Sequence, residues 1–388
     1  MIVTRIGLTD FRNYRVADVE LVAGANLFVG SNGQGKTNLV EALGFLSTLG
    51  SHRVSSDQVM IRQDADSAII RARLRYGDRE ALVEVELNRK SPNRAQVNRV
   101  PIRVRELPRH VSTVVFAPED LAIVRGEPSG RRRFLDELLL RRSPRLGGVL
   151  ADYERVVRQR NTLLKSARAT GARQLSTLDV WDDKLITLGA ELIEARAALV
   201  RELEPRVAAA YASIAGADHR IRLANQLSIL TADPDADPAE ANSADLTADR
   251  ATSVFRSALE RLRPRELERA ITLVGPHRDD LLLELNGMPA RSTASHGESW
   301  SFALALRLAS AEVLRVDSLH GDPVLVLDDV FAELDEKRRE RLANAVGGFE
   351  QVLITAAVLG DVPGRLTGNT VHIDAGTIVE APGEGAGT

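Results

Sequence analysis

The residues from Gly30 to Thr37 read Gly-Ser-Asn-Gly-Gln-Gly-Lys-Thr, which fits the spacing G-x-x-x-x-G-K-[ST] of a phosphate-binding loop. Glycines in such a loop let backbone N–H groups turn toward an anion with no Cβ in the way. The lysine places its ammonium on the β- and γ-phosphates of a nucleotide, and the last hydroxyl holds Mg²⁺. We therefore predict that ATP with Mg²⁺ is bound by Gly30, Ser31, Asn32, Gly33, Gln34, Gly35, Lys36 and Thr37.

Two adjacent carboxylates form a second chemical group. Asp328 ends the apolar run Val324–Leu327 and is followed by Asp329. A carboxylate at the carboxyl end of a central strand can hold Mg²⁺, and its neighbour can orient or deprotonate a water. Alone, such a pair would be read as a turn at a strand end. With the loop present, we predict Lys36, Asp328 and Asp329 as catalytic residues, and Thr37 with Asp328 as metal ligands.

A third group, Ser295-His296-Gly297-Glu298-Ser299, precedes a long apolar helix predicted for residues 298–317. A serine hydroxyl and a glycine N–H at a helix N-terminus can bind an anion. The loop already has its own phosphate, so the economical inference is that this group caps the γ-phosphate held by a second copy. An ordinary capping box between Ser295 and Glu298 is the alternative, and both can hold at once.

The elements around these groups predict an α/β fold. A short apolar strand, residues 26–29, enters the loop, and an amphipathic helix, residues 38–46, leaves it. The continuous apolar runs 324–327 and 352–355 are typical of central parallel strands. Residues 68–74 and 81–87 alternate about the turn at Gly77-Asp78, which predicts an antiparallel layer.

The middle of the chain has helical spacing. Apolar residues from Leu178 to Leu199 recur at intervals of three and four, and residues 149–167 form a second such stretch, separated from the first by Gly171. We predict an antiparallel helical arm, with a pair of core helices as the alternative. The acidic segment Asp233–Asp249 is expected to be a mobile loop.

The predicted organisation is a mixed-sheet ATPase head interrupted by a helical insertion. Its expected parts are the N-terminal part of the head at residues 1–120, the arm at 121–264, the C-terminal part of the head at 265–380, and a disordered tail at 381–388.

Composition limits the possible partners. The chain of 388 residues has a formal net charge of −3 and no cysteine, which excludes disulfides and zinc–cysteine sites. It has no secretory pattern and no apolar run of the ~20 residues that a membrane helix needs, so we expect a cytoplasmic protein without a membrane partner. Any DNA contact must come from a local basic patch such as Arg131–Arg133 or Arg141–Arg142. A solvated helix face is the competing interpretation of both runs.

These groups in this order resemble the ATP-binding heads of the ABC class. Gly30–Thr37 is similar to the Walker A motif, Ser295–Glu298 to the signature, and Val324–Asp328 with Asp329 to Walker B. Ala332–Asp335 resembles the D-loop. The long helical insertion between Lys36 and Asp328 resembles the SMC-like branch of this class rather than the transporters.

A closer resemblance is to the RecF family of bacterial recombination and gap-repair proteins. The stretches that carry it run from the N-terminus to about residue 360, and they are Phe11–Tyr14, Ser51–Arg53, Phe116–Leu121, Arg131–Asp136 and Gly275–Leu281. The resemblance implies an ATP-dependent homodimer that clamps gapped DNA at single-strand/double-strand junctions. It also implies that, with the RecR and RecO proteins, such a dimer helps load recombinase and supports replication restart and SOS induction.

The same resemblance assigns further roles to single residues. It implies that Arg12 and Asn13 touch nucleotide phosphates, and that Ser295, Gly297 and Glu298 reach the ATP of the second copy. The switch histidine of the ABC class is absent, because Thr355 ends the strand after which it would follow. Asp329 reaches less far than a glutamate, so we expect a weak, DNA-stimulated ATPase.

Two other classes of protein stay open at this point. One is a transporter motor or a nuclease-linked ATPase, and the other is a scaffold for which ATP is only a ligand. DNA cleavage with Mg²⁺ would favour a nuclease-linked enzyme, and a lack of phosphate release would favour the scaffold.

Overall fold

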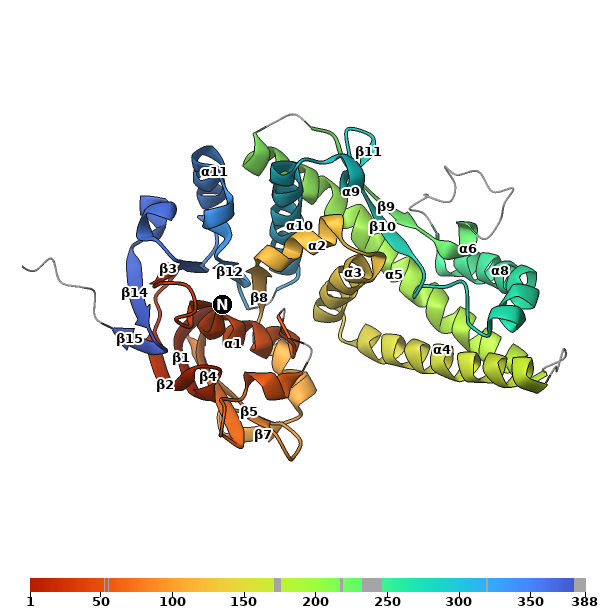
Figure 1. The fold of residues 1–388 in the computed structure, drawn as a ribbon, viewed down its shortest axis with the longest axis horizontal. Helices are drawn as coiled ribbons and strands as arrows, with labels where there is room; N and C mark the ends of the chain where they lie inside the picture. Colours follow the sequence, from red (N-terminus) through yellow and green to blue (C-terminus); the bar gives the residue numbers. More distant parts are fainter. Residues whose placement is uncertain are drawn as a thin grey trace, which may run out of the picture. The chain divides into compact units, whose positions relative to one another are not determined.

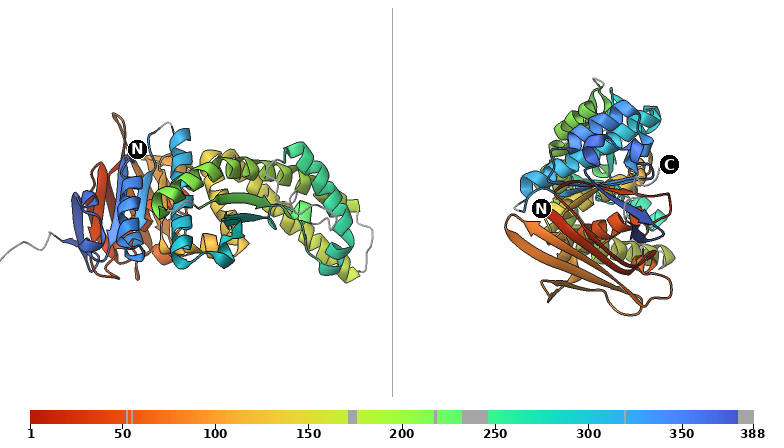
Figure 2. Two further views of the ribbon diagram at one scale, coloured as in Figure 1. Left: turned by 90° about the horizontal axis from the view of Figure 1, so that it is seen from above. Right: turned by 90° about the vertical axis from the view of Figure 1, so that its left-hand side faces the viewer.

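The structure is a computed structural model that describes residues 1–51, 53–54, 56–170, 176–216, 219–231, 246–318 and 320–379 (Figures 1 and 2). The chain divides into two compact units. We call the first the sheet unit; it comprises Met1–Leu121, Ala209–Ala217 and His296–Thr388. We call the second the helical unit; it comprises Ala122–Ala208 and Asp218–Ser295.

The sheet unit contains a mostly parallel sheet whose described strands are ordered β15-β14-β3-β13-β12-β8. Its parallel strands are β3 (Gly24–Val29), β8 (Thr113–Phe116), β12 (Val324–Asp328), β13 (Gln351–Ala356) and β14 (Asn369–Asp374). The hairpin strand β15 (Thr377–Val379) pairs antiparallel with β14. The register sets Asp328 opposite Thr355 and Thr355 opposite Phe28, so β3, β12 and β13 end at one edge.

An antiparallel sheet forms the second layer of the sheet unit, and Figure 2 shows its strands running side by side. In order across the described sheet they are β2 (Tyr14–Glu20), β1 (Ile2–Phe11), β4 (Ser67–Tyr76), β5 (Arg79–Asn88), β6 (Arg94–Val97) and β7 (Val100–Ile102). Side chains along β4 alternate between buried and exposed, as the period of two predicts.

One apolar core joins the two sheets and the helix that follows the loop, α1 (Lys36–Thr48). Buried side chains of both sheets and of α1, including Ile70, Phe45 and Val326, belong to one cluster. The helix is buried along most of its length because it lies inside this core rather than on its surface. The predicted strand, loop and helix are therefore confirmed, with the strand beginning two residues earlier, at Gly24.

Two longer helices and several short ones complete the sheet unit. The longer ones are α10 (His296–Asp317) and α11 (Glu336–Val346). The short 3₁₀ helices are η1 (Asp57–Met60), η2 (Val104–Arg109), η3 (Pro118–Asp120), η4 (Val330–Glu333), η5 (Leu359–Asp361) and η6 (Gly364–Leu366). The polar turn after β8 is fixed to α10, because Asp120 Oδ1 accepts hydrogen bonds from the Arg307 guanidinium at 2.6 and 3.0 Å.

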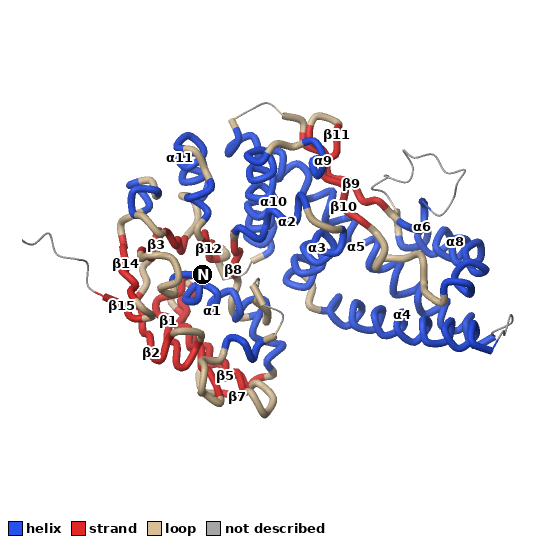
Figure 3. The backbone as a smooth tube through the Cα atoms, viewed as in Figure 1, coloured by secondary structure: helices blue, strands red, loops and turns tan. Residues whose placement is uncertain are grey.

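The helical unit is built on long helices, which Figure 3 colours blue. They are α3 (Pro128–Arg142), α4 (Arg145–Thr170), α8 (Ala248–Arg269) and α5 (Ser176–Ala215), the last of which continues into the sheet unit. Ion pairs Arg145–Glu191 and Arg160–Asp182 join α4 to α5 in opposite chain order, so these helices run antiparallel, as predicted.

Shorter elements of the helical unit include a small sheet of three described strands. These are β9 (Ile221–Gln226), β10 (Asp280–Leu285) and β11 (Met288–Pro289). The short helices are α2 (Leu121–Arg125), which begins at the last residue of the sheet unit, and α6 (Ser228–Thr231) and α9 (Ala290–Thr293).

The observed division differs from the expected boundaries in two places: residues 209–217, predicted in the arm, belong to the sheet unit, and the boundary expected after residue 264 lies further along the chain. Residues 265–295 lie in the helical unit, because α8 continues to Arg269 and β10 pairs antiparallel with β9 over its whole length. The head therefore resumes at His296 rather than at residue 265. The predicted tail and most of the predicted acidic loop lie outside the described residues.

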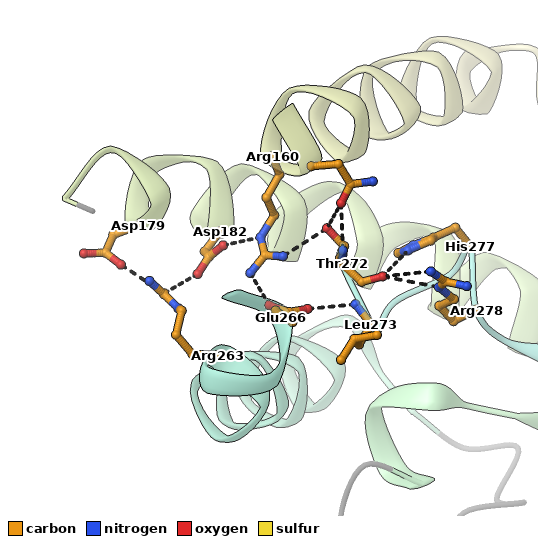
Figure 4. Close-up of polar contacts among 10 residues, drawn as sticks. Arg160, Asp179, Asp182, Arg263, Glu266, Thr272, Leu273, His277 and Arg278 are labelled. Atoms are coloured by element: carbon orange, nitrogen blue, oxygen red, sulfur yellow. Dashed lines mark hydrogen bonds and ion pairs between the residues drawn. The ribbon is translucent and has the colours of Figure 1, made fainter. Parts of the chain in front are cut away.

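The helical unit contains a fully buried arginine, shown in Figure 4. Arg160 is 0% exposed, and its guanidinium donates to Asp182 Oδ1 and Glu266 Oε2, each at 2.6 Å, and to the Thr272 hydroxyl at 3.0 Å. Burial alone would lower the pKa of Arg160, but Glu266 and Asp182 together raise it. Four segments of the unit thus meet around one cation.

A buried carboxyl group lies elsewhere in the same unit. Asp279 is 4% exposed, and its Oδ1 accepts hydrogen bonds from the Ser228 N–H and hydroxyl, both at 2.7 Å. Its Oδ2 has no hydrogen-bond partner among the described residues. Burial raises the pKa of Asp279 to about 6, against the opposing effects of Ser228, Arg196 and Arg132.

This raised pKa predicts a pH-dependent stability. Between the unfolded pKa of about 4 and the folded pKa, the folded state binds more protons, so stability falls as pH rises through about 6. We expect the Asp279→Asn variant to gain about 2–3 kcal/mol in free energy of unfolding over the wild type between pH 4 and 7, since one pKa unit is about 1.4 kcal/mol. Urea denaturation across this range measures it.

The quantity to compare is the difference in free energy of unfolding between variant and wild type. Burial lowers the pKa of the nearby His277 to about 4, and this group makes stability rise with pH in both proteins. Ser228→Ala should move the wild-type decline to higher pH, since Ser228 hydrogen bonds hold the pKa of Asp279 down. A pH-independent difference between Asp279→Asn and wild type would contradict the prediction.

Candidate nucleotide-binding site

The loop between β3 and α1 needs glycine at two positions for steric reasons. Gly35, which caps α1, has φ 116°, a region that residues with a side chain rarely adopt, and a Cβ there would lie 2.7 Å from Asn13 Nδ2. A Cβ on Gly30 would lie 2.2 Å from the carbonyl oxygen of Ile373. The glycines thus let the Asn13 side chain and the Ile373 backbone approach the loop closely.

These approaching segments hold the loop by hydrogen bonds. The Gln34 carbonyl accepts from Asn13 Nδ2 and from the Gly376 N–H, each at 2.9 Å. The Tyr14 hydroxyl donates to the Gly35 carbonyl at 3.0 Å. The loop is therefore clamped in place by the β1–β2 turn on one side and the β14–β15 turn on the other.

Lys36 carries a buried positive charge. It is 3% exposed, and its ammonium donates to the carbonyls of Gly30 at 2.8 Å and Ser31 at 3.2 Å. No carboxylate of the described residues forms an ion pair with it. A buried charge that forms no ion pair is costly, so this position favours an anionic ligand beside the loop.

At the carboxyl end of β12, one oxygen of the Asp328 carboxylate lies between two hydroxyl groups. Asp328 Oδ1 accepts hydrogen bonds from the Thr37 hydroxyl at 2.9 Å and the Thr355 hydroxyl at 2.7 Å. The Asp329 N–H in turn donates to Thr355 Oγ at 2.9 Å. The structure therefore brings together Thr37, Asp328 and Asp329, and it adds Thr355.

Asp329 has an unusual backbone and environment. Its φ is 52°, a left-handed conformation that is uncommon for a residue other than glycine. Burial raises the pKa of its carboxyl group, with Lys36 opposing and Asp328 adding to this rise. A carboxyl with a raised pKa is a better proton acceptor at neutral pH, as a general base requires.

The oxygens at this edge fit a magnesium ion. Mg²⁺ prefers hard oxygen ligands and in nucleotide sites keeps waters, taking one or two protein oxygens together with phosphate oxygens. The Thr37 hydroxyl and the Asp328 carboxylate are such oxygens, and they lie within hydrogen-bond distance of each other beside the glycine loop. The predicted metal ligands are thus adjacent, and their assignment stays a prediction.

Arg12 and Asn13 lie beside the loop but make different contacts. The Arg12 guanidinium donates to both carboxylate oxygens of Glu41 in α1, at 2.9 and 2.6 Å, and the Glu41 side chain is fully buried. Asn13 contacts the loop directly. Contact of either residue with a nucleotide phosphate stays a prediction.

The predicted signature lies at the start of α10. Ser295 is exposed and immediately precedes the first helical residue, His296, which accepts a hydrogen bond from Trp300 Nε1 at 3.1 Å. The Arg338 guanidinium of α11 lies over Gly297, where a Cβ would be 2.4 Å from Nη1. A side chain at position 297 would therefore displace the Arg338 guanidinium.

Sequence reasoning missed two partners of the site. It noted Thr355 only as a strand end, although β13 in fact continues to Ala356, and it did not assign Glu41 to hold Arg12. A signal for Thr355 was present, because a hydroxyl ends an otherwise apolar run in the strand next to Asp328. For Glu41 the signal was a carboxylate inside an apolar helix.

Comparisons with known proteins agree with this geometry. Residues 2–359 match the model of the RecF/RecN/SMC N-terminal domain family. A DNA replication and repair protein RecF from Clavibacter michiganensis subsp. michiganensis is 64% identical over 390 residues, covering 98% of this chain and 96% of the relative. The protein of the same description from Leifsonia xyli subsp. xyli is 64% identical over 384 residues, covering 98% and 100%.

Solved structures agree as well. A structure described as the recombination mediator protein RecF-ATP in the RecFOR pathway is 28% identical, with a TM-score of 0.85 and coverage of 97% of this chain and 96% of that one. An SMC head domain from Pyrococcus furiosus is 14% identical with a TM-score of 0.54 over 97% and 94%, which supports the fold alone.

The mixed sheet, the glycine loop and the Asp328 edge define an ABC-type P-loop ATPase head of the SMC-like branch, with an inserted helical region. The chain belongs to the RecF family of DNA replication and repair proteins. None of the helices in the described residues is both long enough and apolar enough to span a membrane.

Proposed function

We propose that the protein binds ATP with Mg²⁺ at the glycine loop, that two copies close face to face over two ATP molecules, and that this closure clamps DNA at single-strand gaps. The observation that carries the proposal is the buried Lys36 ammonium, which forms no ion pair with a carboxylate of the described residues and lies beside Thr37 and Asp328. A triphosphate supplies the missing counter-charge.

Each residue has a role in this reaction. Lys36 and the loop N–H groups bind the β- and γ-phosphates, and Thr37 and Asp328 hold the magnesium. When bound, Mg²⁺ neutralises charge that develops on the phosphate oxygens. Asp329 orients the attacking water and accepts its proton, which its raised pKa favours.

The second half of the site comes from the other copy. Ser295 is exposed at the N-terminus of α10, so it is accessible to a second chain, and Gly297 and Glu298 follow it in the first turn. The backbone N–H groups and the positive dipole end of a helix favour a phosphate there. We propose that hydrolysis is slow and DNA-stimulated, since Asp329 is one methylene shorter than a glutamate.

The biological setting follows from the relatives. They are DNA replication and repair proteins, and one solved relative is described as a recombination mediator in the RecFOR pathway. We propose by extension that this chain acts in the cytoplasm with the RecR and RecO proteins, helps load recombinase at gaps, and supports replication restart and SOS induction.

The central test is sedimentation of the purified protein with ATP and Mg²⁺, with and without gapped duplex DNA. We expect ATP to promote dimer formation, and the Ser295→Arg variant to bind ATP but not to dimerise, because a bulky side chain occupies the mating face. A protein that stays monomeric with ATP, or that hydrolyses ATP at full rate at high dilution, would refute the composite site.

Thr355 offers a test of the carboxylate geometry. Its hydroxyl donates to Asp328 and accepts from the Asp329 N–H. We expect Thr355→Val to lower the ATP hydrolysis rate by about tenfold to a hundredfold, because a hydrogen bond to a charged group is worth about 1.5–3 kcal/mol. ATP affinity should fall much less, since Lys36 and the loop are intact. Thr355→Ser keeps the hydroxyl and should retain most of the rate; equal losses in both variants would contradict this role.

A further inference from the structure

A groove in the helical unit lies outside the nucleotide site. It has a volume of about 490 Å³ and is walled by α3 on one side and α4 on the other. Tyr153, Arg196 and His277 are among the residues that line it. The groove is lined entirely by residues of the helical unit, so it is independent of the glycine loop and of Asp328.

The arginines of α3 that were predicted as one basic run have three different environments. The Arg131 side chain is 5% exposed and donates to both oxygens of Asp280, at 2.7 and 2.8 Å, so it serves folding. Arg132 is half-buried in the groove and donates only to the backbone carbonyl of Asp279, at 2.7 Å. Arg133 is exposed on the groove wall.

Arg132 lacks the partner that its burial calls for. No ion pair joins Arg132 or Arg133 to a carboxylate of the described residues. Burial lowers the pKa of Arg132 and Arg196 adds to this effect, while Asp280, Asp279 and Asp136 oppose it. Three carboxylates, Asp136, Glu137 and Glu154, also line the groove, but none of them forms an ion pair with Arg132. A half-buried guanidinium without an ion-paired carboxylate is complementary to an anion, and its planar fork matches a phosphate.

The rest of the groove is already balanced or weakly paired. Arg196 is held by both oxygens of Asp136, at 2.9 and 2.8 Å, and by the Pro276 carbonyl at 2.7 Å, which fixes the floor. On the opposite wall, Arg158 makes only a 3.7 Å contact with Glu154, and both side chains are mostly exposed. Because such an exposed pair is weak, Arg158 can release Glu154 and bind another anion.

We propose that this groove binds the phosphate backbone of DNA, with Arg132 as the buried anchor and Arg133 and Arg158 as contacts from the two walls. Guanidinium groups on facing helices suit a chain of phosphates better than a single small anion. The proposal rests on the DNA binding proposed above and assigns it to one surface of the helical unit.

The test is the salt dependence of binding to gapped duplex DNA, measured by fluorescence anisotropy in the presence of ATP and Mg²⁺. The full-length protein is compared with the triple variant Arg132→Gln, Arg133→Gln and Arg158→Gln. The slope of log affinity against log salt should become shallower by about 0.9 for each guanidinium that neutralises a phosphate. Arg168→Gln, exposed on α4 outside the groove, is the matched control and should leave the slope unchanged.

A second variant guards against unfolding of the helical unit. The double variant Arg133→Gln and Arg158→Gln changes exposed residues only, so it keeps the test valid if Arg132→Gln unfolds the unit. Its slope of log affinity against log salt should still be shallower than that of the wild type. An unchanged slope in both variants, with tight DNA binding by the wild type, overturns the groove and leaves the proposed function standing. If the variants lose binding to an acidic protein partner while their salt slope for DNA is unchanged, the proposal of a DNA-binding groove is also overturned. A wild type that binds no DNA in any nucleotide state refutes the proposed function itself.

Discussion

Replacing Lys36 by alanine should weaken ATP binding by about tenfold to over a hundredfold, because a charge-assisted hydrogen bond is worth about 1.5–3 kcal/mol. The structure gives a specific reason for a large effect. Lys36 is 3% exposed, and its ammonium donates hydrogen bonds to the carbonyls of Gly30 and Ser31. Bound phosphate would therefore meet a positive charge that is already desolvated and positioned.

Titration calorimetry with ATP and Mg²⁺ measures this affinity. Lys337→Ala, which removes an exposed lysine from α11 of the same unit, controls for the loss of charge and should bind ATP as the wild type does. Urea denaturation of Lys36→Ala should confirm that the sheet unit is folded. An affinity for ATP within error of the wild type would remove the phosphate role assigned to Lys36.

The largest effect on stability is expected from Arg160→Met. Methionine fills a similar volume but leaves Asp182 and Glu266 without their shared cation in a buried site. Removing one partner of a buried ion pair typically destabilises by about 3–5 kcal/mol. Urea denaturation, monitored by circular dichroism, should show this loss as a lower midpoint for the helical unit.

Two further variants separate burial from charge. Arg256→Ala breaks an exposed ion pair with Asp183 of α5 and should be close to neutral. Adding Asp182→Asn and Glu266→Gln to Arg160→Met should recover much of the loss, since no buried charge is then left unpaired. Equal destabilisation by Arg160→Met and Arg256→Ala would contradict the argument.

The elements that sequence predicted well are those with local patterns. The glycine loop, its strand and its helix follow from adjacent residues, and so do the alternating strands β4 and β5 about Gly77-Asp78. The helical spacing in α4 and α5 and the apolar runs of β12 and β13 are local in the same sense. Each needs a window of only about 4–18 residues to be read.

The features that sequence did not predict depend on residues far apart in the chain. β9 and β10 pair across the whole of α8, which is why the head resumes at His296 and not at residue 265. The partners of Arg160, one of which is 106 residues away, lie on two other helices and on the segment after α8, and they give no local signal. Thr355 joins Asp328 and Asp329 only because β12 and β13 are neighbours in register.

The bracing of the glycine loop has a consequence for how the protein is made. The Gln34 side chain and the backbone N–H of Ala375 are 341 residues apart, and their hydrogen bond is part of the clamp from the β14–β15 turn. A ribosome adds about 5–20 residues per second, so the loop waits tens of seconds for that turn to be translated. A nascent chain that already displays every nucleotide motif would thus have a loop braced only by the β1–β2 turn, and tight capture of ATP should begin only after the β14–β15 turn has been translated.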